Sequence, residues 1–163
     1  AGPAPFSAIA TGLGRRLAEL DPAHAAGYTE RAAAVAADLT ALDAEYRRAL
    51  TGCTRRAMVT SHAAFGYLAD RYGFAQVGIS GIDPDAEPSP ARLAEVAKVA
   101  RQEKVTTIFT EELVSPKVAE VLATEIGAKT DVLNPLESRP ADGDYLSAAR
   151  QNLTKLRAAL GCP

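Results

Sequence analysis

The chain has 163 residues, a formal net charge of −2 at pH 7 and hydrophobic residues at 47% of its positions. This length is enough for one domain with a sizeable core. The weak negative charge gives no reason to expect nucleic acid or an anionic membrane as a partner. No run of about 18 apolar residues is present to cross a bilayer. The first residues do not resemble a signal peptide, so we expect any targeting segment to lie upstream or to have been removed.

The N-terminal third of the chain is predicted to be helical. One helix is expected over residues 7–20 and a second over 22–50, each with an apolar face. Asp21 is a candidate cap for the second helix, and Pro22 would occupy its first position. The second helix is longer than a small α/β core usually requires.

Strands and helices alternate after this helical segment. The expected strands are 57–60, 76–79, 105–109 and 131–133. Helices are expected over 62–72 and 144–160. Two further helices are expected to begin at Ser89-Pro90 and at Ser115-Pro116, the latter ending at Gly127. Short strands that alternate with helices imply right-handed crossovers and a parallel sheet. We therefore predict an α/β fold: a Rossmann-like lobe with a four-stranded parallel sheet flanked by helices, preceded by a long helical N-terminal segment.

The two cysteines, Cys53 and Cys162, are far apart in the sequence and match no metal-ligand spacing. One precedes the first predicted strand and the other follows the last predicted helix. We favour a disulfide formed in an oxidising compartment, with two unpaired thiols as the alternative. Closing a loop of this length would stabilise the fold by up to about 4–5 kcal/mol in the chain-entropy model.

Polar residues follow the predicted strands, and in a parallel sheet these strand ends meet at one edge. They include His62, Glu111, Asn134 and the loop 80–87. Imidazole with carboxylate is a set that suits zinc. If His62 stands at a helix N-terminus, the helix dipole disfavours imidazolium and leaves the ring available to a cation. The alternative interpretation is that His62 only caps or hydrogen-bonds locally; His24 is expected to be solvated and without a role.

Catalytic chemistry has less support in the sequence. There is no glycine-rich phosphate loop after a strand. Ser61 and His62 are adjacent, and neighbouring side chains at a helix start should point apart, which does not suit a catalytic triad. Glu111 and Glu112 should likewise diverge, with one of them solvated. A small α/β enzyme that uses His62 and Glu111 is nevertheless the competing interpretation.

Residues 60–73, Thr-Ser-His-Ala-Ala-Phe-Gly-Tyr-Leu-Ala-Asp-Arg-Tyr-Gly, resemble a known family. It comprises the zinc- and manganese-binding solute receptors of bacterial ABC importers (cluster A-I, ZnuA type). Similar stretches occur in the same order at 86–90, 108–111, 114–119 and 132–136. The resemblance extends over roughly residues 3–162.

The resemblance implies two α/β lobes joined by a long rigid helix, with the metal held between the lobes. Residues 1–53 would contain the interlobe connecting helix, and residues 54–163 would form the C-terminal lobe. His62 matches the third metal ligand, and a histidine there is similar to the zinc-type receptors. Asn134 stands where the family usually has an aspartate as fourth ligand, which leaves that coordination position to water or to a glutamate. Glu111 matches a family glutamate near the cleft that supports the ligands.

The family places its first two histidine ligands before the segment that this chain contains. We therefore expect a fragment: the C-terminal lobe of an extracytoplasmic receptor, periplasmic or lipid-anchored, whose signal segment is not in this chain. Zinc, or manganese, is the expected cargo of the intact receptor, and this chain alone should bind metal weakly or not at all. Its partners would be the importer's membrane permease and the missing N-terminal lobe. In this preferred interpretation the chain is not an enzyme. Two alternatives remain open: the small enzyme described above, and an assembly module that forms a homodimer through exposed apolar surface.

Overall fold

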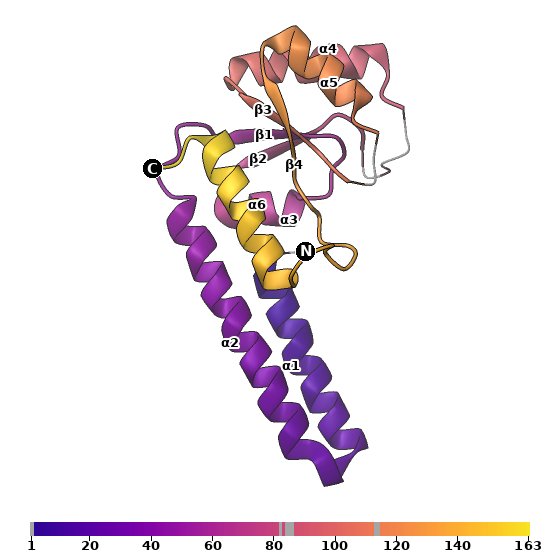
Figure 1. Ribbon diagram of the computed structural model, residues 1–163, viewed down its shortest axis with the longest axis vertical. Coiled ribbons are helices and arrows are strands. Elements are labelled where there is room, and N and C mark those ends of the chain that lie inside the picture. The colour runs from indigo at the N-terminus through magenta and orange to yellow at the C-terminus, as the bar shows by residue number, and fades with distance from the viewer. Residues whose placement is uncertain (1, 82, 84–86, 113–114) are drawn as a thin grey trace. The chain divides into compact units, whose positions relative to one another are not determined.

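The computed structural model describes residues 2–81, 83, 87–112 and 115–163 (Figure 1). The chain divides into two units, residues 1–48 and 49–163. Ala86 and Val114, which belong to two of the family-like stretches, lie outside the described residues. Within the described part, no helix combines the length and the apolar character that a membrane span requires.

The first unit consists of helices. Its elements are α1 (Pro3–Leu20), the 3-10 helix η1 (Pro22–His24) and α2 (Ala25–Ala49). The sequence prediction of a single helix from residue 22 is corrected here, because the first turn after α1 is a 3-10 turn. Asp21 makes no side-chain cap; its carboxylate instead contacts His24 and Tyr28. A side chain at Gly14 would collide with Ala32, so this glycine allows the close packing of α1 and α2.

The second unit alternates strands and helices as predicted. Its elements in chain order are β1 (Ala57–Thr60), α3 (Gly66–Tyr72), β2 (Ala75–Gly78), α4 (Pro90–Gln102), β3 (Thr107–Thr110), α5 (Lys117–Ile126), β4 (Lys129–Val132) and α6 (Tyr145–Leu160). The strands form one sheet in the order β2-β1-β3-β4, and all three pairings are parallel. The predicted four-stranded parallel sheet is therefore confirmed.

Helices cover both faces of this sheet. Figure 1 shows α4 and α5 on one face and α3 and α6 on the other. Every residue of the central strands β1 and β3 is buried, as expected for strands covered on both sides. The core between the sheet and α4 and α5 is built of aliphatic side chains: Val59, Ile79, Val96, Ala97, Ala100, Val105, Ile108, Ala119, Leu122 and Ala123.

In the second unit, the starts of α3 and α5 differ from the prediction. The helix α3 begins at Gly66 rather than at residue 62, and its preceding residue, Phe65, makes no side-chain cap. The backbone N–H of Phe65 instead donates to the Gln76 side chain, and that of Ala63 to a carbonyl in the next loop, so tertiary partners replace a cap. Before α5, Pro116 precedes the helix and Ser115 provides no cap, whereas Ser89 caps α4 as predicted.

The disulfide Cys53–Cys162 is present, and no cysteine is free. It joins the segment before β1 to the end of α6. The Arg55 N–H also donates to the Leu160 carbonyl over 2.9 Å, beside the disulfide. Gly161 ends α6 in a left-handed conformation, where a side chain would collide with neighbouring atoms. The last helix is thus fixed to the start of the sheet both covalently and by backbone hydrogen bonds.

Candidate functional site

His62 lies two residues beyond the end of β1, in a loop that is held on both sides. The Ser61 N–H donates to the Phe109 carbonyl of β3 over 2.9 Å, and the Ala63 N–H donates to the Gly81 carbonyl over 2.8 Å. The His62 residue is only 6% exposed. Since α3 begins four residues later, the expectation that a helix dipole acts on this ring is wrong.

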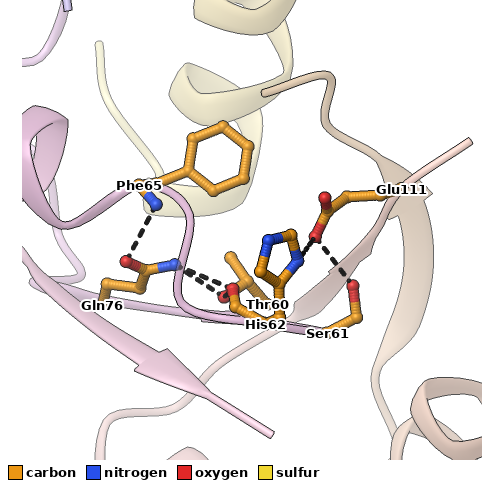
Figure 2. A network of polar contacts seen from close by, with 6 residues as sticks. All are labelled: Thr60, Ser61, His62, Phe65, Gln76 and Glu111. Atoms are coloured by element: carbon orange, nitrogen blue, oxygen red, sulfur yellow. Dashed lines mark hydrogen bonds and ion pairs between the residues drawn. The ribbon is translucent and has the colours of Figure 1, made fainter. Parts of the chain in front are cut away.

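Glu111 follows directly after β3, the neighbour of β1, and it meets His62 at the carboxyl edge of the sheet (Figure 2). Its Oε1 lies 2.5 Å from His62 Nδ1 and accepts the Ser61 hydroxyl over 3.0 Å. The His62 and Glu111 side chains are 7% and 5% exposed. The expectation that Ser61 and His62 point apart is therefore wrong, because both side chains reach the same carboxylate oxygen. Glu112 is exposed, as expected for one of the two glutamates.

This arrangement determines which ring nitrogen can bind a ligand. A carboxylate only accepts hydrogen bonds, so the proton of the contact belongs to His62 Nδ1. Among the described residues nothing hydrogen-bonds to Nε2, whose lone pair is then available to a cation. Carboxylates orient metal-binding histidines in this way. A hydrolase triad would instead need the hydroxyl to donate to the imidazole, whereas Ser61 donates to Glu111.

Gln76 of β2 forms hydrogen bonds to the loop that carries His62, and it was not predicted as a site residue from the sequence. Its side chain contacts Thr60, His62 and Phe65 (Figure 2). The one available signal was an amide side chain inside a short strand, which does not by itself identify a partner.

Asn134 lies two residues beyond β4, and both its side chain and its backbone form hydrogen bonds with other residues. Its Oδ1 accepts the Leu136 N–H over 2.7 Å, and Leu136 has a positive φ of 60°. The Asn134 backbone exchanges two hydrogen bonds with the Asn152 side chain, over 3.1 and 2.6 Å. No hydrogen bond in the described part of the chain joins Asn134 to His62 or Glu111. Of the three predicted site residues, the structure joins His62 and Glu111 by a direct contact, and within the described residues Asn134 contributes no hydrogen bond to that pair.

No cluster of three or more histidine, cysteine, aspartate or glutamate side chains in the described ranges is arranged to hold a metal ion. His62 and Glu111 form a pair, and Asn134 is a neutral amide. The other histidine, His24, has a side chain that is 75% exposed, and its Nδ1 contacts Asp21 over 2.8 Å. It is solvated as predicted. Within these residues, His62 is the histidine that a buried carboxylate orients.

Comparison with known proteins places the whole arrangement in one family. The model described as "ZnuA: Zinc-uptake complex component A periplasmic" matches residues 2–159. The zinc-binding lipoprotein AdcA of Streptococcus pneumoniae serotype 4 is 45% identical over 135 residues, 80% of this chain and 27% of AdcA. The high-affinity zinc uptake system protein ZnuA of Bacillus subtilis is 39% identical over 150 residues, 89% of this chain and 47% of ZnuA. The chain therefore spans less than half the length of these curated relatives.

Solved structures agree with the sequence matches. The laminin-binding protein Lmb of Streptococcus agalactiae, described as a bifunctional protein with adhesin and metal transporting activity, aligns with a TM-score of 0.92 at 39% identity. That alignment covers 97% of this chain and 62% of Lmb. The AdcAII protein of Streptococcus pneumoniae aligns with a TM-score of 0.87 at 37% identity over 97% of this chain and 60% of its own. With nearly its whole length matched in sequence and in fold, the chain belongs to the family of ZnuA, zinc-uptake complex component A.

Proposed function

We propose that this chain is the C-terminal lobe and connecting segment of an extracytoplasmic zinc receptor that delivers its metal to the permease of an ABC importer. Residues 54–163 would form the lobe and residues 1–53 the segment that contains the connecting helix. The observation that carries the proposal is the His62–Glu111 pair: a buried carboxylate holds Nδ1 and leaves Nε2 for the metal. It stands in a chain that matches the zinc-uptake family over residues 2–159.

The ligand types favour zinc as the cargo. Imidazole nitrogen suits zinc, whereas manganese prefers carboxylate, carbonyl and water oxygens. His62 would bind the ion through Nε2, and Glu111 would orient the ring. Asn134 would stand at the fourth ligand position with a neutral amide oxygen that already accepts the Leu136 N–H. This side of the site would therefore contribute one strong ligand.

Zinc sites in proteins use three or four protein ligands. We infer that the remaining ligands come from an N-terminal lobe that this chain does not contain. The relatives support this inference, since the chain spans only 27% of AdcA and 47% of ZnuA. Alone, the chain is expected to bind zinc weakly, and the metal would be held firmly only between the two lobes.

The same chain offers support for an extracytoplasmic compartment and for a role in binding rather than in catalysis. A disulfide between Cys53 and Cys162 suits an oxidising, extracytoplasmic location, and one relative is described as a lipoprotein. Catalysis is not proposed, because the Ser61 hydroxyl and the His62 ring both donate to Glu111 and neither activates the other. Glu111 would serve binding rather than proton transfer.

The apolar face of α1 supports a contact with the rest of the receptor. Ile9, Leu13 and Leu20 are 64%, 57% and 66% exposed, which is unusual for large aliphatic side chains on one helix. We propose that the N-terminal lobe covers them. The alternative is that a second copy of the chain covers this face. Size-exclusion chromatography with light scattering tests it: a homodimer that dissociates on Leu13→Glu would assign the face to a second copy.

Zinc titration of the chain tests the metal assignment. The nuclear magnetic resonance signals of the two histidine rings are followed as zinc chloride is added to the unsubstituted chain and to His62→Ala and His24→Ala. We expect weak binding that shifts the His62 ring, persists in His24→Ala and is lost in His62→Ala. Zinc that leaves the His62 ring unchanged would contradict its role as ligand. Tight one-to-one binding that depends on His62 would contradict the inferred need for a second lobe.

A further inference from the structure

We propose that Gln76 is a positioning residue for His62, fixing the backbone from which the imidazole projects. The inference rests on the proposed function in one respect, namely that the positioned His62 ring binds zinc. Gln76 lies in the edge strand β2, in register with Met58 of β1. It is half-buried and belongs to none of the residues that would touch the metal.

The Gln76 amide makes three contacts, and all of them reach the loop between Thr60 and Phe65 (Figure 2). Its Nε2 donates to Thr60 Oγ1 over 2.8 Å and to the His62 carbonyl over 3.1 Å. Its Oε1 accepts the Phe65 N–H over 3.0 Å. The side chain thus bridges the two ends of the loop and holds its middle.

The His62 carbonyl is the centre of this network. It accepts hydrogen bonds from the Thr60 hydroxyl over 2.6 Å, from the Ala64 N–H over 3.1 Å and from Gln76. The peptide plane that begins at the His62 Cα is therefore fixed, and with it the direction in which the ring leaves the backbone. Glu111 holds the other end of the same residue, at Nδ1. The imidazole is constrained from both ends, so that Nε2 has one direction in which to present its lone pair.

The chemistry of the network requires an amide. A glutamine side chain both donates and accepts, whereas a carboxylate only accepts and a methionine side chain offers no N–H donor. In Gln76→Met, the Phe65 N–H loses its acceptor and the His62 carbonyl keeps two of three donors. In Gln76→Glu, the acceptor for Phe65 remains but both donated bonds disappear. Both variants should therefore loosen the His62 backbone: methionine also removes the acceptor of the Phe65 N–H, whereas glutamate places a carboxylate oxygen against the His62 carbonyl.

The test uses His24→Gln as background, which leaves His62 as the single histidine of the chain. The two ring ¹⁵N shifts at neutral pH report which nitrogen carries the proton, without any metal. Zinc chloride is then added, and the affinity is read from the same ring signals. Gln102→Met is the matched control, since Gln102 is an exposed amide at the end of α4. Circular dichroism and backbone amide shifts establish that each variant is folded.

We expect the background chain and Gln102→Met to show the proton on Nδ1 and the same zinc affinity. Gln76→Met should shift the two ring nitrogens toward an average of both tautomers and weaken zinc binding by about tenfold, as loss of outer partners of a metal ligand does. Gln76→Glu should shift the ring nitrogens and the zinc affinity in the same direction, and it decides the role of Gln76 if Gln76→Met does not fold. Folded Gln76 variants with unchanged ring shifts would overturn the positioning role. Zinc that leaves the His62 ring unperturbed in the background chain would overturn the proposed function, while the metal-free ring shifts would still decide the role of Gln76.

Discussion

Two parts of the same sheet edge differ in how their polar side chains are used. Beyond β1 and β3, the buried side chains of His62 and Glu111 contact each other although they are 49 positions apart in the sequence. This contact uses His62 Nδ1 and leaves Nε2 available. Beyond β4, the Asn134 oxygen is taken by the N–H of Leu136, two residues away. A long-range partner orients the His62 ring, whereas the side-chain oxygen of Asn134 accepts a hydrogen bond within a local turn. The proposed metal-binding histidine therefore lies at the middle of the edge, beyond β1 and β3, rather than at its β4 end.

Glu111→Ala should produce the largest loss of stability. It leaves the buried His62 Nδ1–H and Ser61 hydroxyl without their acceptor, and unsatisfied buried donors cost about 1–3 kcal/mol each. We expect the free energy of unfolding to fall by about 2–4 kcal/mol, measured by urea denaturation followed by circular dichroism. Glu112→Ala, at the exposed neighbouring position, should change it by less than about 0.5 kcal/mol. Equal effects of the two substitutions would contradict the importance of the buried pair.

Asn152→Ala tests the β4 end of the comparison. Asn152 is 5% exposed and supplies both hydrogen bonds to the Asn134 backbone. Its loss should lower the free energy of unfolding by about 1–3 kcal/mol, less than Glu111→Ala, because Asn134 itself is only half-buried. The exposed neighbour Gln151 provides the control, as Gln151→Ala. A cost above that of Glu111→Ala would reverse the ranking of these two parts of the edge.

Asn134→Asp asks whether the β4 end can be converted to a metal ligand. Aspartate can still accept the Leu136 N–H, and it adds the charge that a zinc ligand normally carries. We expect zinc affinity to rise by roughly tenfold, equivalent to about 1.4 kcal/mol, as measured by zinc titration of the His62 ring signals. Gln102→Glu adds the same charge on the exposed end of α4 and should have no effect. Unchanged affinity in Asn134→Asp would place this residue outside the metal site.

The smallest expected effect concerns the start of α6, the helix that carries Asn152. Asp144 caps this helix, and the N–H and hydroxyl of Ser147 hold the pKa of its carboxyl below the ordinary value of 3.8. Because the pKa is lower in the folded state, the stabilisation is complete above that ordinary value and is lost as the pH falls below it. The thermal midpoint of the unsubstituted chain should therefore decrease more than that of Asp144→Asn between about pH 5 and pH 2. Parallel curves for the two proteins would contradict this role of Asp144.

The architecture could be predicted because it depends on local patterns. Short β-branched runs separated by helical periodicity indicate a parallel sheet, and a serine before a proline correctly marked the start of α4. A parallel sheet in turn places His62, Glu111 and Asn134 at one edge. The choice of partner at that edge follows from strand order, since β1 and β3 are neighbours and β4 lies beyond them.

The details that decide chemistry depend on tertiary contacts and were not predictable. The residues after β1 have helix-forming periodicity from residue 62, yet their N–H groups bind Gly81 and Gln76, and the helix begins at Gly66. The same contacts turn Ser61 and His62 toward one carboxylate. Nothing in the local sequence around Gln76 indicates the loop that it holds.

The Cys53–Cys162 bond has a mechanical consequence. The two cysteines are 109 positions apart, and the entire sheet lies between them in the chain. Tension applied along the polypeptide is therefore carried from one cysteine to the other by the sulfur atoms, and the strands in between bear none of it. As long as the disulfide is intact, the unit that contains His62 cannot be pulled out into an extended chain.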